Sequence, residues 1–250
     1  MRNVVAALAL LTAFSASAYD FSGNEIFLPV VSRVAGANNT QWRTDLVVSS
    51  RDQNTPTEVS MFFFPYPSGE GIQHRFTLEP LQTVTMPDVV LNTFGLTQRA
   101  GTIWLGAVNE SVEIAANARI YNTGNSAGEF GQVIHGLPPE SLSKTSFLHG
   151  LTGINGNRTN VGIANPSNTR ALFSLTWYDK HGESHGSVSL GIDPWQVLLI
   201  NDIFTYVGQP ADEGMTLRVR SSNNALYAYA SIVRNDTGDA YTIIGNGRDD

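Results

Sequence analysis

The chain of 250 residues contains no cysteine. This absence excludes disulfide bonds, which often stabilise small domains of exported proteins. It also excludes a lipid anchor on an N-terminal cysteine. The fold must therefore be held together by its hydrophobic core alone.

The sequence also lacks an excess of positive charge. It has 15 Lys and Arg residues against 22 Asp and Glu residues, which gives a formal net charge of −7. No run of Lys and Arg interrupts this acidic composition. Nucleic acids and anionic membrane surfaces attract basic patches, so the composition argues against both as partners.

Long apolar runs are absent except at the N-terminus. Arg2 is followed by the apolar stretch Val4–Leu11, and Ala16-Ser17-Ala18 places small residues before a cleavage point. The apolar run is shorter than the ~20 residues that span a bilayer. We therefore interpret residues 1–18 as a cleaved secretory signal peptide. The mature protein is then periplasmic, cell-surface or extracellular, without membrane insertion.

The rest of the chain repeats one pattern. Arg43-Thr44-Asp45-Leu46-Val47-Val48 returns as Arg158-Thr159-Asn160-Val161-Gly162-Ile163. Other landmarks recur at spacings between 112 and 115 residues, namely Asp88 and Asp202, Gly101 and Gly214, and Ile120 and Ile232. This near-constant spacing indicates an internal duplication. We predict one domain at residues 19–144 and a second at 145–250, each of ordinary domain size.

Each repeat has the pattern of β-structure, with apolar alternation, β-branched and aromatic residues, and regularly spaced turn residues. In the first repeat we expect strands near 25–31, 44–50, 57–65, 72–78, 82–86, 101–108 and 112–121. Their counterparts are expected near 145–149, 159–164, 170–178, 184–191, 195–200, 214–220 and 225–234. The sequence thus predicts an all-β protein made of two tandem antiparallel β-sandwich domains.

One short helical segment is expected at the same place in each repeat. Asp88 precedes Val89-Val90-Leu91, and Asp202 precedes Ile203-Phe204. A carboxylate in this position can accept hydrogen bonds from the free N–H groups of a first helical turn. We interpret both aspartates as helix N-caps, with a catalytic or metal-binding role as the alternative.

Arg43 and Arg158 stand at the start of equivalent strands. An arginine at such a position most often braces a neighbouring carboxylate or carbonyl group, because its guanidinium carries five donors. The alternative is an anion-binding site in each domain, so both arginines are candidate ligand-binding residues.

No set of catalytic groups or metal ligands can be recognised. Ser126 in Gly124-Asn125-Ser126-Ala127-Gly128 and Ser184 in Gly182-Glu183-Ser184-His185-Gly186 have the Gly-x-Ser-x-Gly spacing. The all-β pattern lacks the strand-turn-helix context that makes such a serine a nucleophile. His181 and His185 would share a face only on a helix, whereas the segment has the pattern of a strand and a turn, and no third zinc ligand is apparent. Residues 235–239 resemble part of a calcium loop, but a simple turn fits them better. We expect no cofactor and no metal.

The aromatic residues have binding potential. Phe62-Phe63-Phe64-Pro65-Tyr66 places successive rings on opposite faces of a strand, so that Phe63 or its neighbours could face outward or meet the other repeat. Trp177 and Tyr178 occupy the corresponding strand of the second repeat, and Trp195 follows. Packing in the core and between domains is the first interpretation. The alternative is an exposed aromatic platform for sugar rings, with Trp177, Tyr178 and Trp195 as ligand-binding residues.

Several motifs carry a resemblance to known proteins. They are Phe27-Leu28-Pro29, Trp42-Arg43-Thr44-Asp45-Leu46, the Asn165-Pro166 turn, the Asp202 segment and Ala228-Tyr229-Ala230-Ser231. The chain resembles a tandem β-sandwich repeat of secreted bacterial proteins and, more remotely, the sensory rhodopsin transducer family. The resemblance implies an interaction or accessory role and transfers no catalytic residue.

These observations favour an exported, non-catalytic interaction or structural protein of the cell envelope or extracellular space. Its partner would be an envelope or extracellular protein, or a second copy of itself. The second hypothesis is a carbohydrate-binding protein that binds a polysaccharide on an aromatic platform. A hydrolase with a site between the repeats is the third.

Overall fold

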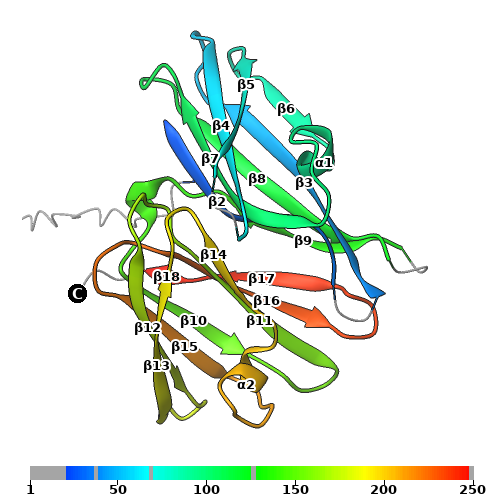
Figure 1. Ribbon diagram of the computed structural model, residues 1–250, viewed down its shortest axis with the longest axis vertical. Coiled ribbons are helices and arrows are strands. Elements are labelled where there is room, and N and C mark those ends of the chain that lie inside the picture. The colour runs from blue at the N-terminus through cyan, green and yellow to red at the C-terminus, as the bar shows by residue number, and fades with distance from the viewer. Residues whose placement is uncertain (1–20, 37–38, 68–69, 125–127, 248–250) are drawn as a thin grey trace, which may run out of the picture.

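The computed structural model describes residues 21–36, 39–67, 70–124 and 128–247. The expected signal peptide, residues 1–18, lies outside this part of the chain. The described chain is all-β, with antiparallel sheets of nine, five and four strands and only short helices. The predicted class, an antiparallel β-sandwich fold, is confirmed (Figure 1).

The first half of the molecule holds the nine-stranded sheet and one helical turn, α1 (Val89–Asn92). Its strands are β1 (Ser22–Gly23), β2 (Glu25–Ala35), β3 (Gln41–Ser50), β4 (Thr57–Pro65), β5 (Ile72–Leu78), β6 (Thr83–Met86), β7 (Arg99–Ala107), β8 (Ile114–Asn122) and β9 (Phe130–His135). The sheet folds into two layers, β2-β7-β4-β5 and β6-β3-β8-β9, which the end of β2 connects by pairing with β3.

The second half follows a 3-10 turn, η2 (Pro139–Ser141), and contains the other two sheets and one helical turn, α2 (Ile203–Tyr206). Its strands are β10 (Thr145–Leu151), β11 (Asn157–Ala164), β12 (Ala171–Tyr178), β13 (Ser184–Ile192), β14 (Val197–Ile200), β15 (Met215–Ser221), β16 (Tyr227–Arg234), β17 (Ala240–Ile244) and β18 (Asn246–Gly247). The five-stranded sheet has the order β13-β12-β15-β10-β18, and the four-stranded sheet has the order β14-β11-β16-β17.

The two halves share one order of strand pairing. The layer β2-β7-β4-β5 corresponds to β10-β15-β12-β13, and the layer β6-β3-β8-β9 corresponds to β14-β11-β16-β17. The helical turns α1 and α2 follow β6 and β14, the same place in each half. An internal duplication requires this identical order, while the division into two domains stays a prediction.

Each half has its own hydrophobic core between its two layers. Apolar side chains alternate inward along the strands, as in Met61 and Phe63 on β4, and Leu175 and Trp177 on β12. Full burial of one such side chain contributes about 1.5–3 kcal/mol. These cores provide the stabilisation that the absence of cysteine requires.

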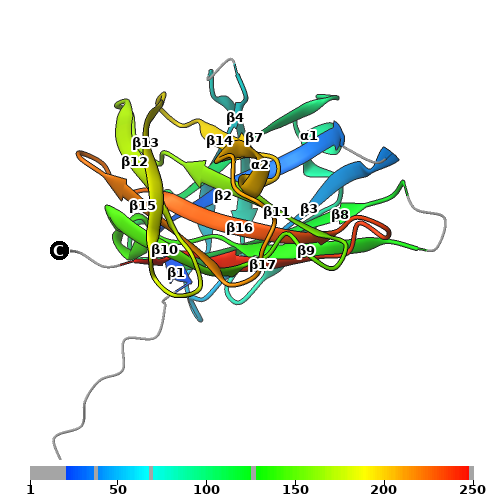
Figure 2. The same ribbon diagram turned by 90° about the horizontal axis from the view of Figure 1, so that it is seen from below.

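A third hydrophobic cluster joins the halves. From the first half it contains Phe27, Ile120 and Ile134, and from the second half Tyr227 and Tyr229, all buried. Figure 1 shows the first half above the second, with β9 and β17 at the junction. Figure 2 shows the same pair of strands from below. The halves therefore pack against each other through an apolar surface.

Polar contacts supplement this junction. The Tyr227 hydroxyl donates a hydrogen bond of 2.6 Å to the carbonyl oxygen of His135. Ser231 Oγ and Thr242 Oγ1 both donate to Gln132 Oε1, at 2.9 and 3.0 Å. Because Gln132 lies on β9 and its donors on β16 and β17, these bonds fix the edges of the two halves side by side.

The interpretation of Asp88 and Asp202 as capping side chains is wrong. Both residues occupy the N-cap position, but neither side chain makes a capping hydrogen bond. Their backbones are strained at positive φ, 43° for Asp88 and 57° for Asp202, whereas a typical N-cap is extended. The carboxylates turn elsewhere: Asp88 pairs with Arg33, and Asp202 accepts from Thr205 Oγ1 at 2.7 Å.

Candidate functional site

The outer surface of the five-stranded sheet is the candidate functional site, and we call it the open face. Leu148, Leu175 and Leu217 point into the core from three adjacent strands, so their neighbours along each strand point outward. Along the strands the open face consists of Thr145, Phe147, His149, Leu172, Ser174, Thr176, Tyr178, Ser187, Ser189, Thr216, Arg218 and Arg220, of which Thr145 and Thr176 are buried by their neighbours. Lys144 and Arg170 belong to the same face and flank one end of it. It is rich in hydroxyl groups and arginines.

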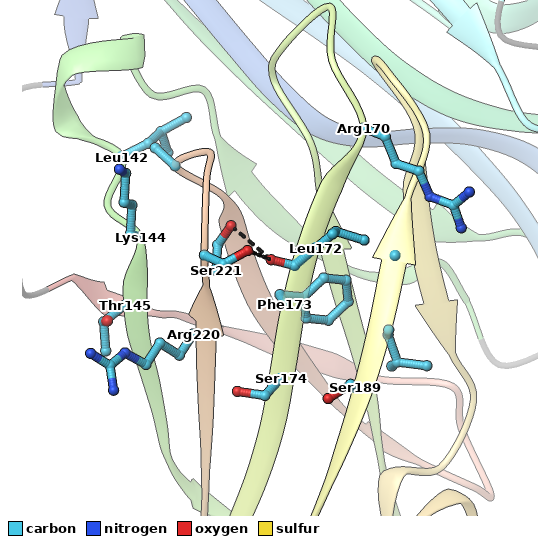
Figure 3. A pocket seen from close by; sticks show the side chains of 14 residues that line it. Leu142, Lys144, Thr145, Arg170, Leu172, Phe173, Ser174, Ser189, Arg220 and Ser221 are labelled. Atoms are coloured by element: carbon cyan, nitrogen blue, oxygen red, sulfur yellow. Dashed lines mark hydrogen bonds between the residues drawn. The ribbon is translucent and has the colours of Figure 1, made fainter.

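A groove of about 1350 Å³ runs over one end of this face. Figure 3 shows Lys144 and Arg220 along one side and Arg170 on the other. Ser174 and Ser189 lie between them, and Leu172 is 54% exposed. The groove is therefore a cationic, hydroxyl-bearing trough with a small apolar element.

The cations of the open face are largely without anionic partners. In the described part of the chain, no carboxylate forms an ion pair with Lys144, Arg218 or Arg220. Arg170 Nε lies 3.7 Å from a carboxylate oxygen of Asp193, but both side chains are well exposed. Such an exposed pair contributes little energy, so Arg170 can change partner at small cost.

Arg218 is held in place by neutral groups. Its guanidinium lies over the Tyr178 ring, 5.7 Å from the ring centroid. Its Nη2 donates to Thr176 Oγ1 at 3.4 Å, and Thr176 Oγ1 donates to Ser187 Oγ at 3.2 Å. These contacts orient the guanidinium without neutralising it, so its charge remains available to a ligand.

A second aromatic group lies beside Arg218. Phe147, opposite Arg218 on the neighbouring strand, stacks on His149 with ring centroids 5.7 Å apart and an interplanar angle of 3°. His149 Nδ1 is 3.2 Å from Thr216 Oγ1. This end of the open face thus combines flat rings, hydroxyl groups and one guanidinium.

The equivalent face of the first half is aromatic and is covered. There Phe27, Trp104 and Phe62 form one row across β2, β7 and β4. Phe62 and Trp104 correspond, 114 residues later, to Thr176 and Arg218, and the strand register adds Phe147 to complete the matching row of the second half. Arg218 thus stands where the first half has Trp104, and Thr176 stands where it has Phe62.

Trp195 covers the aromatic face of the first half. Its ring stacks on both Phe64 and Trp104 with centroid distances of 5.2 Å and interplanar angles of 13° and 12°. Thr102 Oγ1 donates to the carbonyl oxygen of Trp195 at 2.6 Å. In the first half, the position equivalent to Trp195 is Leu81, which has the same positive φ and is 63% exposed. Trp195 therefore covers a face of the other half, whereas its counterpart Leu81 does not.

The three aromatic candidates have separate places. Trp177 is 9% exposed and belongs to the core of the second half, and Trp195 belongs to the junction. Tyr178 is half-buried on the open face. The rings of 62–66 alternate between the two faces of the strand, but Phe63 lies in the core, and its neighbour Phe64 is the ring that meets the other half. The structure does not bring Trp177, Tyr178 and Trp195 onto one surface.

Arg43 braces a carboxylate, as predicted. Its Nε is 3.7 Å from Asp88 Oδ2, which also pairs with Arg33, and its Nη1 donates to the Trp42 carbonyl oxygen at 2.8 Å. Burial and the neighbouring Arg33 lower the pKa of Arg43. The guanidinium is therefore committed to the α1 end of the first half.

Arg158 makes a different contact. Its Nη1 donates to Asn235 Oδ1 at 2.5 Å, which ties β11 to the turn after β16. Burial lowers the pKa of Arg158, against the opposing effect of the Asp202 charge. Arg43 and Arg158 lie in separate halves, and each makes its contacts within its own half.

The repeated Arg-Thr-Asp/Asn motif has a structural role. Thr44 Oγ1 accepts from the Ser32 N–H at 2.8 Å and donates to the Ser32 carbonyl at 3.0 Å. Thr159 Oγ1 makes the same pair of bonds with Thr152, at 3.2 and 2.6 Å. Both threonines are fully buried. Each hydroxyl therefore satisfies a backbone donor and acceptor where the regular strand pairing is interrupted.

The next residue of the motif supports the strained turn. Asp45 Oδ1 accepts from the backbone N–H of Asp88 at 2.9 Å, and Asn160 Oδ1 accepts from that of Asp202 at 3.1 Å. Asp45 and Asn160 therefore make the same hydrogen bond to the backbone of the turn. Their equivalence explains why a charge change between the repeats leaves the local fold intact.

The turn between β12 and β13 gathers three possible metal ligands. Asp179, Glu183 and His185 offer ligand atoms within 4.8 Å of one another. Sequence reasoning missed this group because it considered only the two histidines; His181 uses its backbone N–H to contact Asp179. All three ligands are on one surface turn, and carboxylates commonly lie this close without an ion.

Hydrogen bonds within this turn explain the state of Asp179. Donation from His185 Nε2, 3.0 Å from Asp179 Oδ2, and from the Glu183 N–H lowers the pKa of Asp179 to about 2. A cavity of about 260 Å³ lies next to the turn and is lined by Trp177, Phe204 and other residues. The carboxylate is thus engaged within its own hairpin.

The segment compared with a calcium loop is a turn. Asp236 accepts from Arg234 Nε and Nη2 at 3.1 and 2.8 Å, which lowers the pKa of Asp236 to about 2. Asn235 accepts from Arg158. The oxygen atoms of this segment are therefore used by arginines.

Comparison with protein-family models and with curated proteins finds no match. The resemblance to secreted tandem repeats and to the sensory rhodopsin transducer family stays a prediction. In the described residues, no helix has the length and apolar character needed to cross a bilayer.

Proposed function

We propose that this chain is an exported, non-catalytic interaction protein of the cell envelope or extracellular space, and that its open face binds an anionic partner. The observation that carries the proposal is the contrast between two corresponding faces. The face of the first half is aromatic and docks Trp195, whereas the face of the second half is open and carries Arg218 and Arg220.

The local charge of the open face favours an anion despite the acidic composition of the chain. At 0.1 M salt, charges are screened over about 10 Å, so the potential at a surface is set mainly by its nearest charges. The charged side chains that line the groove are Lys144, Arg170 and Arg220, and Arg218 lies beyond it on β15. In the described chain, Asp193 is the one carboxylate that pairs with any of these four cations. An acidic protein can therefore present one basic face.

The lining of the groove supports binding rather than catalysis. It contains hydroxyl groups, cations and apolar side chains, but neither a carboxylate nor a histidine. General acid–base catalysis at neutral pH usually requires such a group within hydrogen-bonding reach of the substrate. The alternative hydrolase site would lie between the halves, where the described residues form the third hydrophobic cluster.

Affinity capture with charge-reversed variants tests the proposal. The bait is residues 19–250, and the source is the cell's own envelope and medium, with retained proteins and polysaccharides both identified. The variant Arg170→Glu/Arg220→Glu reverses two exposed arginines of the groove. The control Arg75→Glu/Arg99→Glu matches it, because Arg75 also has an exposed carboxylate partner at 2.9 Å and Arg99 has none in the described chain.

We expect a defined component to be retained by the wild type and the control, released by salt, and lost with the groove variant. Retention of the same components by all three baits would contradict the proposal. Loss with both variants would show that net charge, rather than the open face, decides retention.

A further inference from the structure

We infer that the open face binds an acidic polysaccharide, a chain of sugars that carry carboxylates. This inference rests on the proposed function and specifies its partner.

Two of the cations lie over the middle of the sheet, whereas Arg170 lies against Gly191 of the edge strand β13. Arg218 and Arg220 are on β15, and β12 separates them from the edge strand β13. An extended peptide usually binds a sheet by adding a strand to an exposed edge, where backbone groups are free. The centre of a sheet face offers side chains only, which suits a ligand that is recognised through its own polar substituents.

The cations are spaced apart, so they match a ligand whose negative charges are separated from one another. Arg218 and Arg220 are two residues apart on one strand, a distance of about 6.6 Å. Lys144 adjoins Arg220, because Ser221 donates its N–H to the Lys144 carbonyl and Thr145 pairs with Arg220. Arg170 lies across the groove (Figure 3). A polymer with one carboxylate per sugar presents charges in such a dispersed array.

A nucleic acid fits this surface less well. Duplex DNA carries one charge per roughly 1.7 Å of its axis, so it favours a dense cationic stripe. The open face has four dispersed cations in a chain of net charge −7. Four dispersed cations can neutralise only a few phosphates of so dense an array.

Hydroxyl groups and rings provide the remaining contacts of a sugar site. One row across the sheet reads Ser189, Ser174, Arg220 and Thr145, and the next reads Ser187, Thr176, Arg218 and Phe147. Ser187 and Ser189 are exposed and Ser174 is half-buried, whereas Thr145 and Thr176 are buried. The three accessible hydroxyl groups can both donate and accept, as sugar hydroxyls do. Phe147 and Tyr178 add flat apolar surfaces, on which the C–H face of a sugar ring can pack.

Binding of a defined ligand to the whole mature chain tests the inference. The probe is a galacturonate oligomer, measured by calorimetry at low and high salt. The comparison ligands are the same oligomer with its carboxylates methyl-esterified, a glutamate oligomer of equal charge, and a DNA oligomer. The protein variants are the groove variant Arg170→Glu/Arg220→Glu, the separate variant Lys144→Glu, and the control Arg75→Glu/Arg99→Glu.

We expect saturable binding of the galacturonate oligomer that weakens with salt, is lost on esterification, and is unchanged in the control. Each groove variant should bind roughly tenfold more weakly or worse, which corresponds to about 1.4 kcal/mol. Circular dichroism and thermal unfolding establish that each variant is folded. Lys144→Glu changes an exposed side chain without a partner in the described chain, so it keeps the test valid if the double variant fails to fold.

Two results would overturn the inference in different ways. Equal or tighter binding of the glutamate or DNA oligomer, still lost in the groove variants, would replace the polysaccharide with another polyanion and leave the proposed function standing. No binding of any polyanion, together with unchanged envelope capture by the groove variants, would overturn both the inference and the proposed function.

Discussion

Trp195 packs a residue of the second half against the outer face of the first half. It lies in a loop before β14 with a φ of 59°, a backbone conformation that costs energy for a residue other than glycine. The stacking of its ring between Phe64 and Trp104 compensates for that cost. Leu81 has a similar φ of 56° but is mostly exposed.

Replacement of Trp195 by alanine should therefore destabilise the protein by about 2–4 kcal/mol, because it removes a large ring from an apolar junction. Leu81→Ala is the matched control, and it should change the stability by less than about 0.5 kcal/mol. Urea unfolding of both variants measures the difference. Equal effects of the two substitutions would contradict the assigned role of Trp195.

Asp179 provides a test of electrostatics at the residue scale. Its pKa in the folded protein is about 2, below the ordinary value of 3.8, chiefly because His185 donates a hydrogen bond to it. A carboxyl group with a lowered pKa stabilises the folded state above its unfolded pKa. This contribution is lost as the pH falls from near 4 through about 2.

The substitution His185→Ala should raise the pKa of Asp179 towards its ordinary value. Nuclear magnetic resonance titration of the Asp179 carboxyl carbon measures this change, with Asp236 as an internal control because Arg234 lowers its pKa independently. An Asp179 pKa that does not respond to His185→Ala would refute the assigned hydrogen bond.

At the scale of elements, the buried threonines hold the strands where pairing is interrupted. Thr44 sits where β2 passes from one layer to the other, and Thr159 bridges β11 to the loop after β10. In both cases the hydroxyl bonds a backbone N–H and a backbone carbonyl of the same residue. This shared geometry gives the repeated motif a physical reason.

Thr159→Val preserves the shape of the side chain but leaves the Thr152 N–H and carbonyl without their partner. We expect a loss of about 1–3 kcal/mol in the free energy of unfolding. Thr85→Val, at an exposed position of β6, is the control and should be nearly neutral. Chemical denaturation of the two variants measures these changes in the free energy of unfolding. An unchanged free energy for Thr159→Val would show that water replaces the hydroxyl.

The elements themselves were largely predictable from sequence. The strands at 57–65 and 72–78 were predicted with the observed bounds, because apolar and polar residues alternate clearly there. Strands β9 and β17 were missed. In β9 the Gly131 backbone crosses close to Tyr121, and only Ile134 is buried, so the segment carries little hydrophobic signal.

The candidate site was only partly predictable. Arg218 and Arg220 alternate with Leu217 and Val219, a strand pattern that places both cations on one outer face, and this signal was available in the sequence. Lys144 and Arg170 join them from distant segments, which only the fold reveals. The same applies to Trp195, whose ring partners lie about 90 to 130 residues earlier in the chain.

At the scale of the whole molecule, the junction determines whether the two halves unfold together or separately. Two domains of one chain usually move relative to each other unless their interface is large and hydrophobic. Here Phe27, Tyr227, Tyr229 and Trp195 form an apolar cluster, and the Gln132 bonds join the sheet edges. Burial raises the pKa of Tyr229, consistent with its place inside the junction.

We therefore expect the mature chain to unfold in one cooperative thermal transition. Differential scanning calorimetry measures this as agreement between the calorimetric and van't Hoff enthalpies. Two resolved transitions in the wild-type protein would show that the halves unfold independently and that the junction is weak.

If the open face binds an acidic polysaccharide, a map of where the ligand contacts the protein shows it most directly. Backbone amide chemical shifts of isotope-labelled residues 19–250 should be recorded during titration with the galacturonate oligomer. We expect the largest changes on β10, β12 and β15, around Phe147, Ser174, Arg218 and Arg220, with little change in the first half. Changes centred elsewhere, or no change at all, would contradict the claim.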